Sequence, residues 1–322
     1  MICRRAEQTS KIGILGAFAI TASIALAASA HAGKIPNEPH AAPLKPAVMA
    51  VQAPFLSHRV VYQMSLGKAS SGASIQAASG KMFYRFQETC SDWEVETRVF
   101  LRLTHGLQDG NEDIQTTWTY ESNEEFDGNR FRFDVEHKHN GSLIEMLAGN
   151  AWRTVRGTTA TYETDIEDKH MSKNAMFPTA HLGSVLERAR RGETQFSDVV
   201  FDGASEQNPY RVNVFIIGRV MASSDKITAK PKIIAGSRQV PVIDSNSDAF
   251  QAASLGQLPN SPVWRVRLAY FPTINAADLP EFEIEVDFRE DGVAQRIIQD
   301  FGDFQLNLTA VQFEALPPKR CE

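Results

Sequence analysis

Apolar and polar residues alternate with a period of two along most of this chain. In one late segment Phe282, Ile284, Val286 and Phe288 alternate with acidic residues. The same alternation occupies the segments 59–66, 82–86, 93–103, 131–135, 210–216 and 264–270. Strands with one apolar and one polar face are typical of antiparallel sheets that bury a single side. The pattern therefore predicts a mainly β protein.

One segment departs from this period. Leu182, Val185, Leu186 and Ala189 recur at spacings of three and four residues, which is the signature of an amphipathic helix. Thr179 is the expected N-cap and Gly192 is expected just past the end of the helix. A lone helix among many strands needs an apolar surface to cover. We expect a long, curved antiparallel sheet, a β-spiral or open barrel, wrapped around one amphipathic helix.

The beginning of the chain has the layout of a secretory leader. Basic residues precede an apolar run from Ile12 to Ala28, and the small-residue sequence Ala30-His31-Ala32 follows it. This order predicts a signal peptide over residues 1–32 that is cleaved after Ala32. Beyond it the sequence contains no apolar run long enough to cross a membrane. We expect a soluble protein outside the cytoplasm.

The rest of the chain divides into a tether and one domain. Residues 33–54 are rich in proline and alanine, a composition that favours an extended, flexible linker. Residues 55–322 are long enough for a single β domain with a sizeable core. The part near 222–262 is rich in Ser, Ala, Gly and Pro with weak periodicity, which predicts an excursion from the domain surface.

The cysteines change the picture once the leader is removed. The full chain has three, and Cys3 lies in the expected leader, so the exported protein keeps Cys90 and Cys321. An even number of cysteines in an oxidising compartment indicates a disulfide, here between the chain end and an early strand. Two buried, reduced thiols are the alternative.

Charge and motifs narrow the function classes. The formal net charge of −6 argues against a nucleic-acid partner. No Gly-x-Ser-x-Gly, HExxH or glycine-rich phosphate motif occurs, so no catalytic residue, metal or cofactor is assigned from the sequence. A hydrolytic triad assembled from distant residues remains an alternative without a sequence signal of its own.

Two local clusters could carry chemistry. His137 and His139 have the i, i+2 spacing that places both rings on one face of a strand, a geometry compatible with a metal. Because that face also carries apolar residues and no third ligand is near in sequence, we interpret them as a structural or rim pair. Asn140-Gly141, which follows, predicts a tight β-turn.

The second cluster is acidic. Glu121, Glu124, Glu125 and Asp127 precede the turn sequence Gly128-Asn129. A pair of carboxylates could serve a glycosidase. An exposed acidic hairpin is the favoured interpretation.

Several blocks together resemble a known family. They are HRVVYQMSL (58–66), GKMFYRF (80–86) leading to Cys90, FPTAHL (177–182), LPEFE (279–283), DGV (291–293) and FGDF (301–304) before Cys321. In this combination and order the chain resembles the EipB family of periplasmic cell-envelope integrity proteins of Gram-negative bacteria, over about Phe55 to Cys321.

The resemblance implies a many-stranded β-spiral enclosing a helix and a disulfide between the two matching cysteines, Cys90 and Cys321. It implies a non-enzymatic role in envelope integrity, with a shape similar to that of periplasmic lipoprotein carriers and of a related stress-sensing module. It also implies a periplasmic tetratricopeptide-repeat protein as a partner. We therefore expect a binding or scaffold module, with a lipid or lipoprotein carrier and an envelope hydrolase as the alternatives.

Overall fold

The computed structural model describes residues 55–107, 110–220, 261–273, 278–317 and 321. The strands are β1 (His58–Ala69), β2 (Ile75–Glu88), β3 (Asp92–Leu107), β4 (Gly110–Glu125), β5 (Arg130–His139), β6 (Ser142–Arg153), β7 (Thr158–Tyr162), β8 (Lys169–Met171), β9 (Gln195–Val200), β10 (Tyr210–Val220), β11 (Val263–Pro272), β12 (Phe282–Arg289), β13 (Ala294–Asp300) and β14 (Phe304–Ala315). The helix is α1 (Pro178–Arg190), and no helix in the described ranges is long and apolar enough to cross a membrane. The expected leader, the tether and nearly all of the expected excursion lie outside the described residues.

The strands form one antiparallel sheet made of two meanders. Its order is β8-β7-β6-β5-β4-β3-β2-β1-β14-β13-β12-β11-β10-β9. The first eight strands follow chain order outward from β1, and the last six follow it inward to β14, so pairing of β1 with β14 joins the two meanders. In the described part of the chain the end strands β8 and β9 do not pair with each other, so the sheet stays open.

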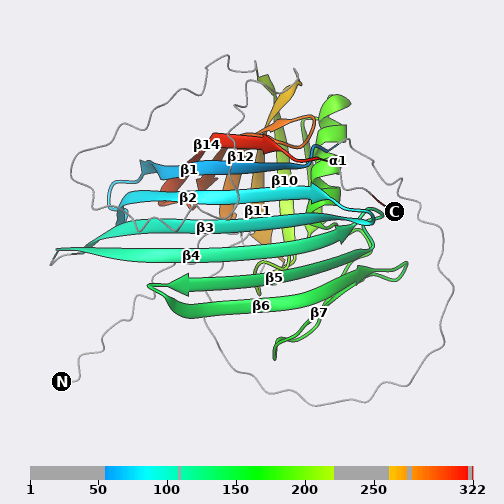
Figure 1. The fold of residues 1–322 in the computed structure, drawn as a ribbon, viewed down its shortest axis with the longest axis horizontal. Helices are drawn as coiled ribbons and strands as arrows, with labels where there is room; N and C mark the ends of the chain where they lie inside the picture. The colour runs from blue at the N-terminus through cyan, green and yellow to red at the C-terminus, as the bar shows by residue number, and fades with distance from the viewer. Residues whose placement is uncertain (1–54, 108–109, 221–260, 274–277, 318–320, 322) are drawn as a thin grey trace.

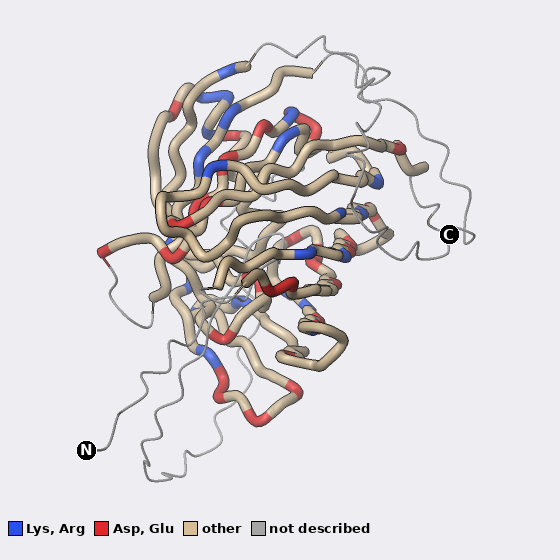
Figure 2. Tube along the Cα trace, turned by 90° about the vertical axis from the view of Figure 1, so that its left-hand side faces the viewer, with Lys and Arg blue, Asp and Glu red and all other residues tan. Residues whose placement is uncertain are grey.

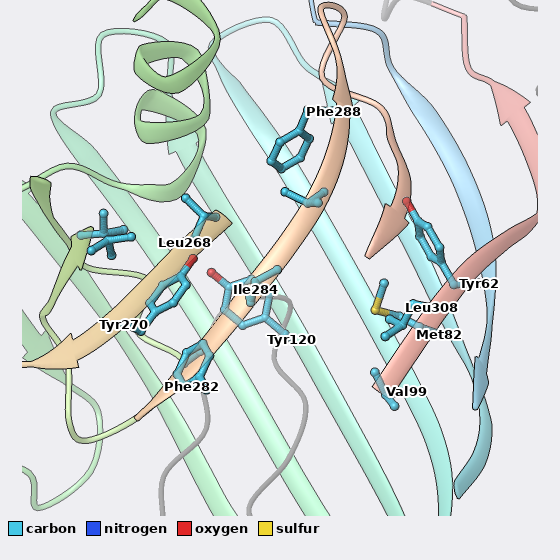
Figure 3. Packing of buried hydrophobic residues seen from close by; sticks show 14 of the residues in the cluster. Tyr62, Met82, Val99, Tyr120, Leu268, Tyr270, Phe282, Ile284, Phe288 and Leu308 are labelled. Atoms are coloured by element: carbon cyan, nitrogen blue, oxygen red, sulfur yellow. The ribbon is translucent and has the colours of Figure 1, made fainter. Parts of the chain in front are cut away.

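The sheet rolls so that its two meanders face each other. In Figure 1, β1–β6 form a front layer that runs across the view, while β10 and β11 run steeply behind it and α1 stands at one end. Figure 3 shows Tyr62 and Met82 of the first meander and Leu268 and Phe282 of the second pointing into one interior. The expected curved sheet around a single helix is confirmed.

Alternation along each strand sets which side chains enter this interior. Val99, Leu101 and Leu103 of β3 are buried, as are Ile284 and Val286 of β12. On the outer face of β11–β13, ion pairs replace apolar contacts, and they join Arg265 to Asp287, Arg267 to Glu285, and Arg296 to Glu285. Acidic and basic residues are interspersed along the trace (Figure 2). The sequence pattern therefore identified the buried faces correctly.

The segment after β9 lies inside the roll, against the first meander. The backbone of Gly203 adopts φ +67°, and a Cβ atom there would lie 2.3 Å from the ring of Phe133 on β5. The Tyr120 hydroxyl of β4 donates to the carbonyl of Asp202 at 2.9 Å. This close approach lets only glycine occupy position 203.

The β5–β6 hairpin has the turn that its sequence predicts. Asn140 and Gly141 have φ values of +50° and +81°, and His139 pairs with Ser142 across the turn. Positive φ at both central residues is the type I′ geometry that Asn-Gly favours. The predicted tight turn is confirmed.

Candidate functional site: the apolar cavity beneath the helix

A cavity of about 90 Å³ lies inside the roll, below α1. Strand residues line its walls and residues at the start and middle of α1 line its roof, among them Pro178, Leu182 and Val185. A buried water needs roughly 10–15 Å³ of comparable volume, so the space exceeds that of a single water several times. Core side chains therefore leave part of the concave face of the sheet unfilled.

The walls are mainly aromatic and aliphatic. They include Tyr62, Met82, Phe86, Leu268, Ile284 and Phe288. Most ligand pockets for apolar molecules combine such walls with a few placed polar groups. The lining suits an alkyl chain or another apolar group.

Four of the six tyrosines of the chain line this cavity. Tyr62 donates to the carbonyl of Ala294 at 2.7 Å, and Tyr120 donates to that of Asp202. Tyr84 and Tyr270 also line the cavity, but within the described ranges their hydroxyls have no hydrogen-bond partner. Burial raises the pKa of both phenols above the usual range, so both remain protonated donors. The sequence signal for this set is tyrosine on the buried face of a strand, where its hydroxyl needs a partner.

The roof helix is held by a carboxylate from β4. Glu124 accepts hydrogen bonds from the backbone N–H groups of Thr179 at 2.7 Å and Ala180 at 2.8 Å. These are orphan donors of the first helical turn, and a negative charge there is also favoured by the helix dipole. Burial raises the pKa of Glu124 to about 7, although the two hydrogen bonds oppose the shift.

This arrangement corrects two predictions. Phe177 is the N-cap residue and provides no side-chain cap, while Pro178 begins the helix and Thr179 lies within the first turn. Glu124 is not part of an exposed acidic hairpin, since only 3% of it is exposed. The prediction for the other end is correct, because Gly192 follows the C-cap Arg191 with φ +80°.

A histidine and a carboxylate meet between α1 and β9. The Nε2 atom of His181 lies 3.6 Å from Oδ2 of Asp198, and Arg188 lies 3.5 Å from the other carboxylate oxygen. Burial, with a smaller contribution from Arg188, lowers the pKa of His181 to about 4. The imidazole is therefore neutral at pH 7, and the ion pair of Asp198 is with Arg188. In the described part of the chain, Nε2 of His181 has no hydrogen-bond partner.

The histidine pair singled out in the sequence lies on the inner face of β5. His137 is 4% exposed, and its ring centroid is 4.6 Å from that of His139. Burial and the neighbouring ring lower the pKa of His137 to about 4. The described residues contain no group of three or more His, Cys, Asp or Glu that could hold a metal ion.

Cys90 and Cys321 are joined in the structure. Their Cα atoms are 5.6 Å apart, and the bond spans a sequence separation of 231 residues. Cys90 lies in the turn between β2 and β3. Two hydrogen bonds hold the same tail, from Leu316 N–H to the carbonyl of Ser57 at 2.8 Å and from the Gln87 amide to that of Pro317 at 3.3 Å. The tail is thus fastened across the ends of β1 and β2.

The chain is similar in sequence and in structure to known proteins. The "Cell envelope integrity protein EipB" of Brucella abortus is 22% identical over 259 residues, which are 80% of this chain and 83% of that protein. The crystal structure of a beta-barrel-like protein with a domain of unknown function, also from Brucella abortus, superposes with a TM-score of 0.67 at 19% identity. It covers 82% of this chain and 99% of that one. The family model described as EipB-like matches residues 49–243 and 233–317. The chain therefore belongs to the EipB-like family.

Proposed function

We propose that this protein is a non-enzymatic binding module of the periplasm, which supports cell-envelope integrity by holding an apolar group in the cavity beneath α1. The name of the Brucella relative supports the envelope role. The observation that carries the binding proposal is the cavity itself, an unfilled apolar space inside a well-packed sheet. Folded interiors ordinarily leave few voids larger than a water molecule.

The lining suggests what kind of group would enter. An acyl chain would contact the walls formed by Met82, Phe86 and Ile284, and a polar head would find the hydroxyls of Tyr84 and Tyr270, which make no hydrogen bond to the described residues. Burial of apolar surface contributes about 25 cal/mol per Å², so even a short chain gains several kcal/mol. The alternative, a carrier of lipids or lipoproteins, requires more than binding, because the cavity would also have to release its occupant.

Native mass spectrometry of protein purified from the periplasm tests the proposal. A co-purifying lipid supports binding or carriage. A co-purifying protein, including a tetratricopeptide-repeat protein, supports a scaffold instead. If neither is found and no apolar probe binds, the proposal is wrong.

A binding assay with a matched pair of variants locates the site. The probe is 11-(dansylamino)undecanoic acid, whose fluorescence rises in an apolar environment. Leu182→Trp places a larger side chain in the cavity roof and should weaken probe binding about tenfold or more. Leu66→Trp makes the same change at another half-buried leucine that does not line the cavity, and should leave binding unchanged. Equal effects of the two variants would contradict binding in this cavity.

A further inference from the structure

The outer face of β4–β6 carries a second hollow, on the opposite side of the sheet from the cavity. It has a volume of about 610 Å³, within the range of small-molecule sites. Cross-strand pairing builds it from two neighbouring rows: Asn123, Arg132 and Asn150 form one, and Arg130 and Trp152 belong to the other. All these side chains point away from the core, because their neighbours Phe131 and Ala151 point into it.

Trp152 presents an uncovered aromatic face in this hollow. It is 39% exposed, which makes it the most exposed of the four tryptophans of the chain. Elsewhere in the molecule an arginine covers such rings, with Arg219 4.8 Å from the ring centre of Trp264 and Arg211 4.3 Å from that of Phe271. Within the described ranges neither an arginine nor another ring packs on Trp152, although Arg130 is its direct cross-strand neighbour.

The polar groups around the ring have unused hydrogen-bonding capacity. In the described part of the chain, Arg132 has no carboxylate partner, and neither Asn150 nor the Trp152 indole N–H makes a hydrogen bond. The two carboxylates that line the hollow already have partners, since Asp92 accepts from Thr89 at 2.9 Å and from the Asn123 amide at 3.5 Å, and Glu125 lies 3.8 Å from Arg130. Arg132, which makes no ion pair with the described residues, thus offers a fork of donors that matches a carboxylate.

We propose that this hollow binds an acidic saccharide. One sugar ring stacks its C–H face on Trp152, a carboxylate on the sugar pairs with Arg132, and the amides of Asn123 and Asn150 bond its hydroxyls. Arg132 and Trp152 are diagonal neighbours on adjacent strands. Long and aromatic side chains in this relation lie close enough for one ligand to contact both. A purely apolar ligand would leave the guanidinium of Arg132 unpaired, and a purely anionic one would leave the indole face unused.

Calorimetric titration of the mature protein at pH 7 with three probes tests the chemistry. Trigalacturonate should bind saturably, and maltotriose, a trisaccharide without carboxylates, should bind at least about tenfold more weakly. Tri-glutamate carries the same charge on a peptide and should also bind at least about tenfold more weakly. Failure of trigalacturonate to bind at millimolar concentration, or equal binding of tri-glutamate, would overturn the proposal.

Variants locate the site. Arg132→Gln and Trp152→Gln should each weaken trigalacturonate binding about tenfold or more, with thermal unfolding measured to verify that both proteins fold. Lys81→Gln removes one positive charge from an exposed position on β2, outside the hollow, and should leave binding unchanged. Binding that persists in both hollow variants, or that falls equally with Lys81→Gln, would show a nonspecific charge effect and refute the assignment. The cavity variant Leu182→Trp should leave trigalacturonate binding intact, which keeps this test separate from that of the apolar cavity.

Discussion

The carboxylate of Glu124, near the end of β4, accepts the backbone N–H of Thr179 in the first turn of α1 at 2.7 Å, across 55 residues of sequence. With the second bond to Ala180 it fixes the start of the helix that covers the cavity. The capping group thus comes from the sheet and not from the residues just before the helix. The position of α1 above the cavity therefore depends on one side chain of the first meander.

Glu124→Ala should therefore destabilise the protein by about 1–3 kcal/mol, because two buried N–H groups lose their acceptor. Urea unfolding monitored by circular dichroism measures this change. The control is Glu121→Ala, which removes an exposed carboxylate three residues earlier on the outer face of β4 and should change stability by less than about 0.5 kcal/mol. Equal losses in the two variants would contradict the capping role.

The same residue predicts a pH dependence of defined sign. Because the pKa of Glu124 is raised to about 7 in the folded protein, protonation favours the folded state, and this contribution is present below pH 4.5 and lost as the pH rises through 7. The shift from 4.5 to about 7 corresponds to roughly 3 kcal/mol. Relative to Glu124→Gln, the wild type should gain up to about that amount when the pH falls from 8 to 4.5. The measurement is urea unfolding of both proteins across this range, and a constant difference between them would refute the prediction.

Gly203 and Gly192 form a matched pair for testing how the segment after β9 packs on β5. Both have positive φ, but a Cβ at Gly203 would lie 2.3 Å from Phe133, while one at Gly192 would meet nothing within 4 Å. Gly192→Ala should cost about 1 kcal/mol for its backbone conformation alone. Gly203→Ala should cost about 1–3 kcal/mol more, since the core must also shift. Equal losses in thermal or urea unfolding would show that the segment after β9 does not pack on β5.

Features that depend on residues close together in the sequence could be predicted, and features that depend on residues far apart in the sequence could not. Period-two alternation in β3 or β12 is local, and it identified the buried faces, while the three- and four-residue spacing of Leu182, Val185 and Leu186 located α1. The burial of Glu124 is different in kind. Its neighbours in sequence are acidic and turn-forming, and only the return of the chain after β8 brings a helix N-terminus to it. The cavity also has no local signal, because it forms where the roll of the sheet brings strands of the two meanders face to face beneath α1.

Two tyrosines of the cavity wall should respond differently to loss of the hydroxyl. Tyr62→Phe removes the donor to the carbonyl of Ala294 and should cost about 1–2 kcal/mol of folding free energy. Tyr84→Phe removes a hydroxyl without a partner in the described residues and should change stability by less than about 0.5 kcal/mol. Urea unfolding of the two variants measures the contrast. A large loss for Tyr84→Phe would mean that its hydroxyl is already engaged in the unliganded protein.

The bond between Cys90 and Cys321 makes a prediction that is independent of the cavity. A cross-link over 231 residues restricts the unfolded chain, and the chain-entropy relation sets an upper value near 5 kcal/mol for loops of this size, with about 2–5 kcal/mol typical on removal. Cys90→Ser, Cys321→Ser and the double variant should lose similar amounts, since each removes the same constraint. In the single variants one thiol becomes reactive toward maleimide. Wild-type protein prepared without residues 1–32, and so without Cys3, should show no reactive thiol in the absence of reductant, and two readily labelled cysteines would contradict the bond.

The end of the chain makes a separate prediction. The hydrogen bonds of Leu316 and Pro317 do not involve the cysteines and should persist in all three variants, so trimming by carboxypeptidase should stop near these residues instead of reaching β14. Trimming that proceeds into β14 would show that these two hydrogen bonds do not protect the end of the last strand.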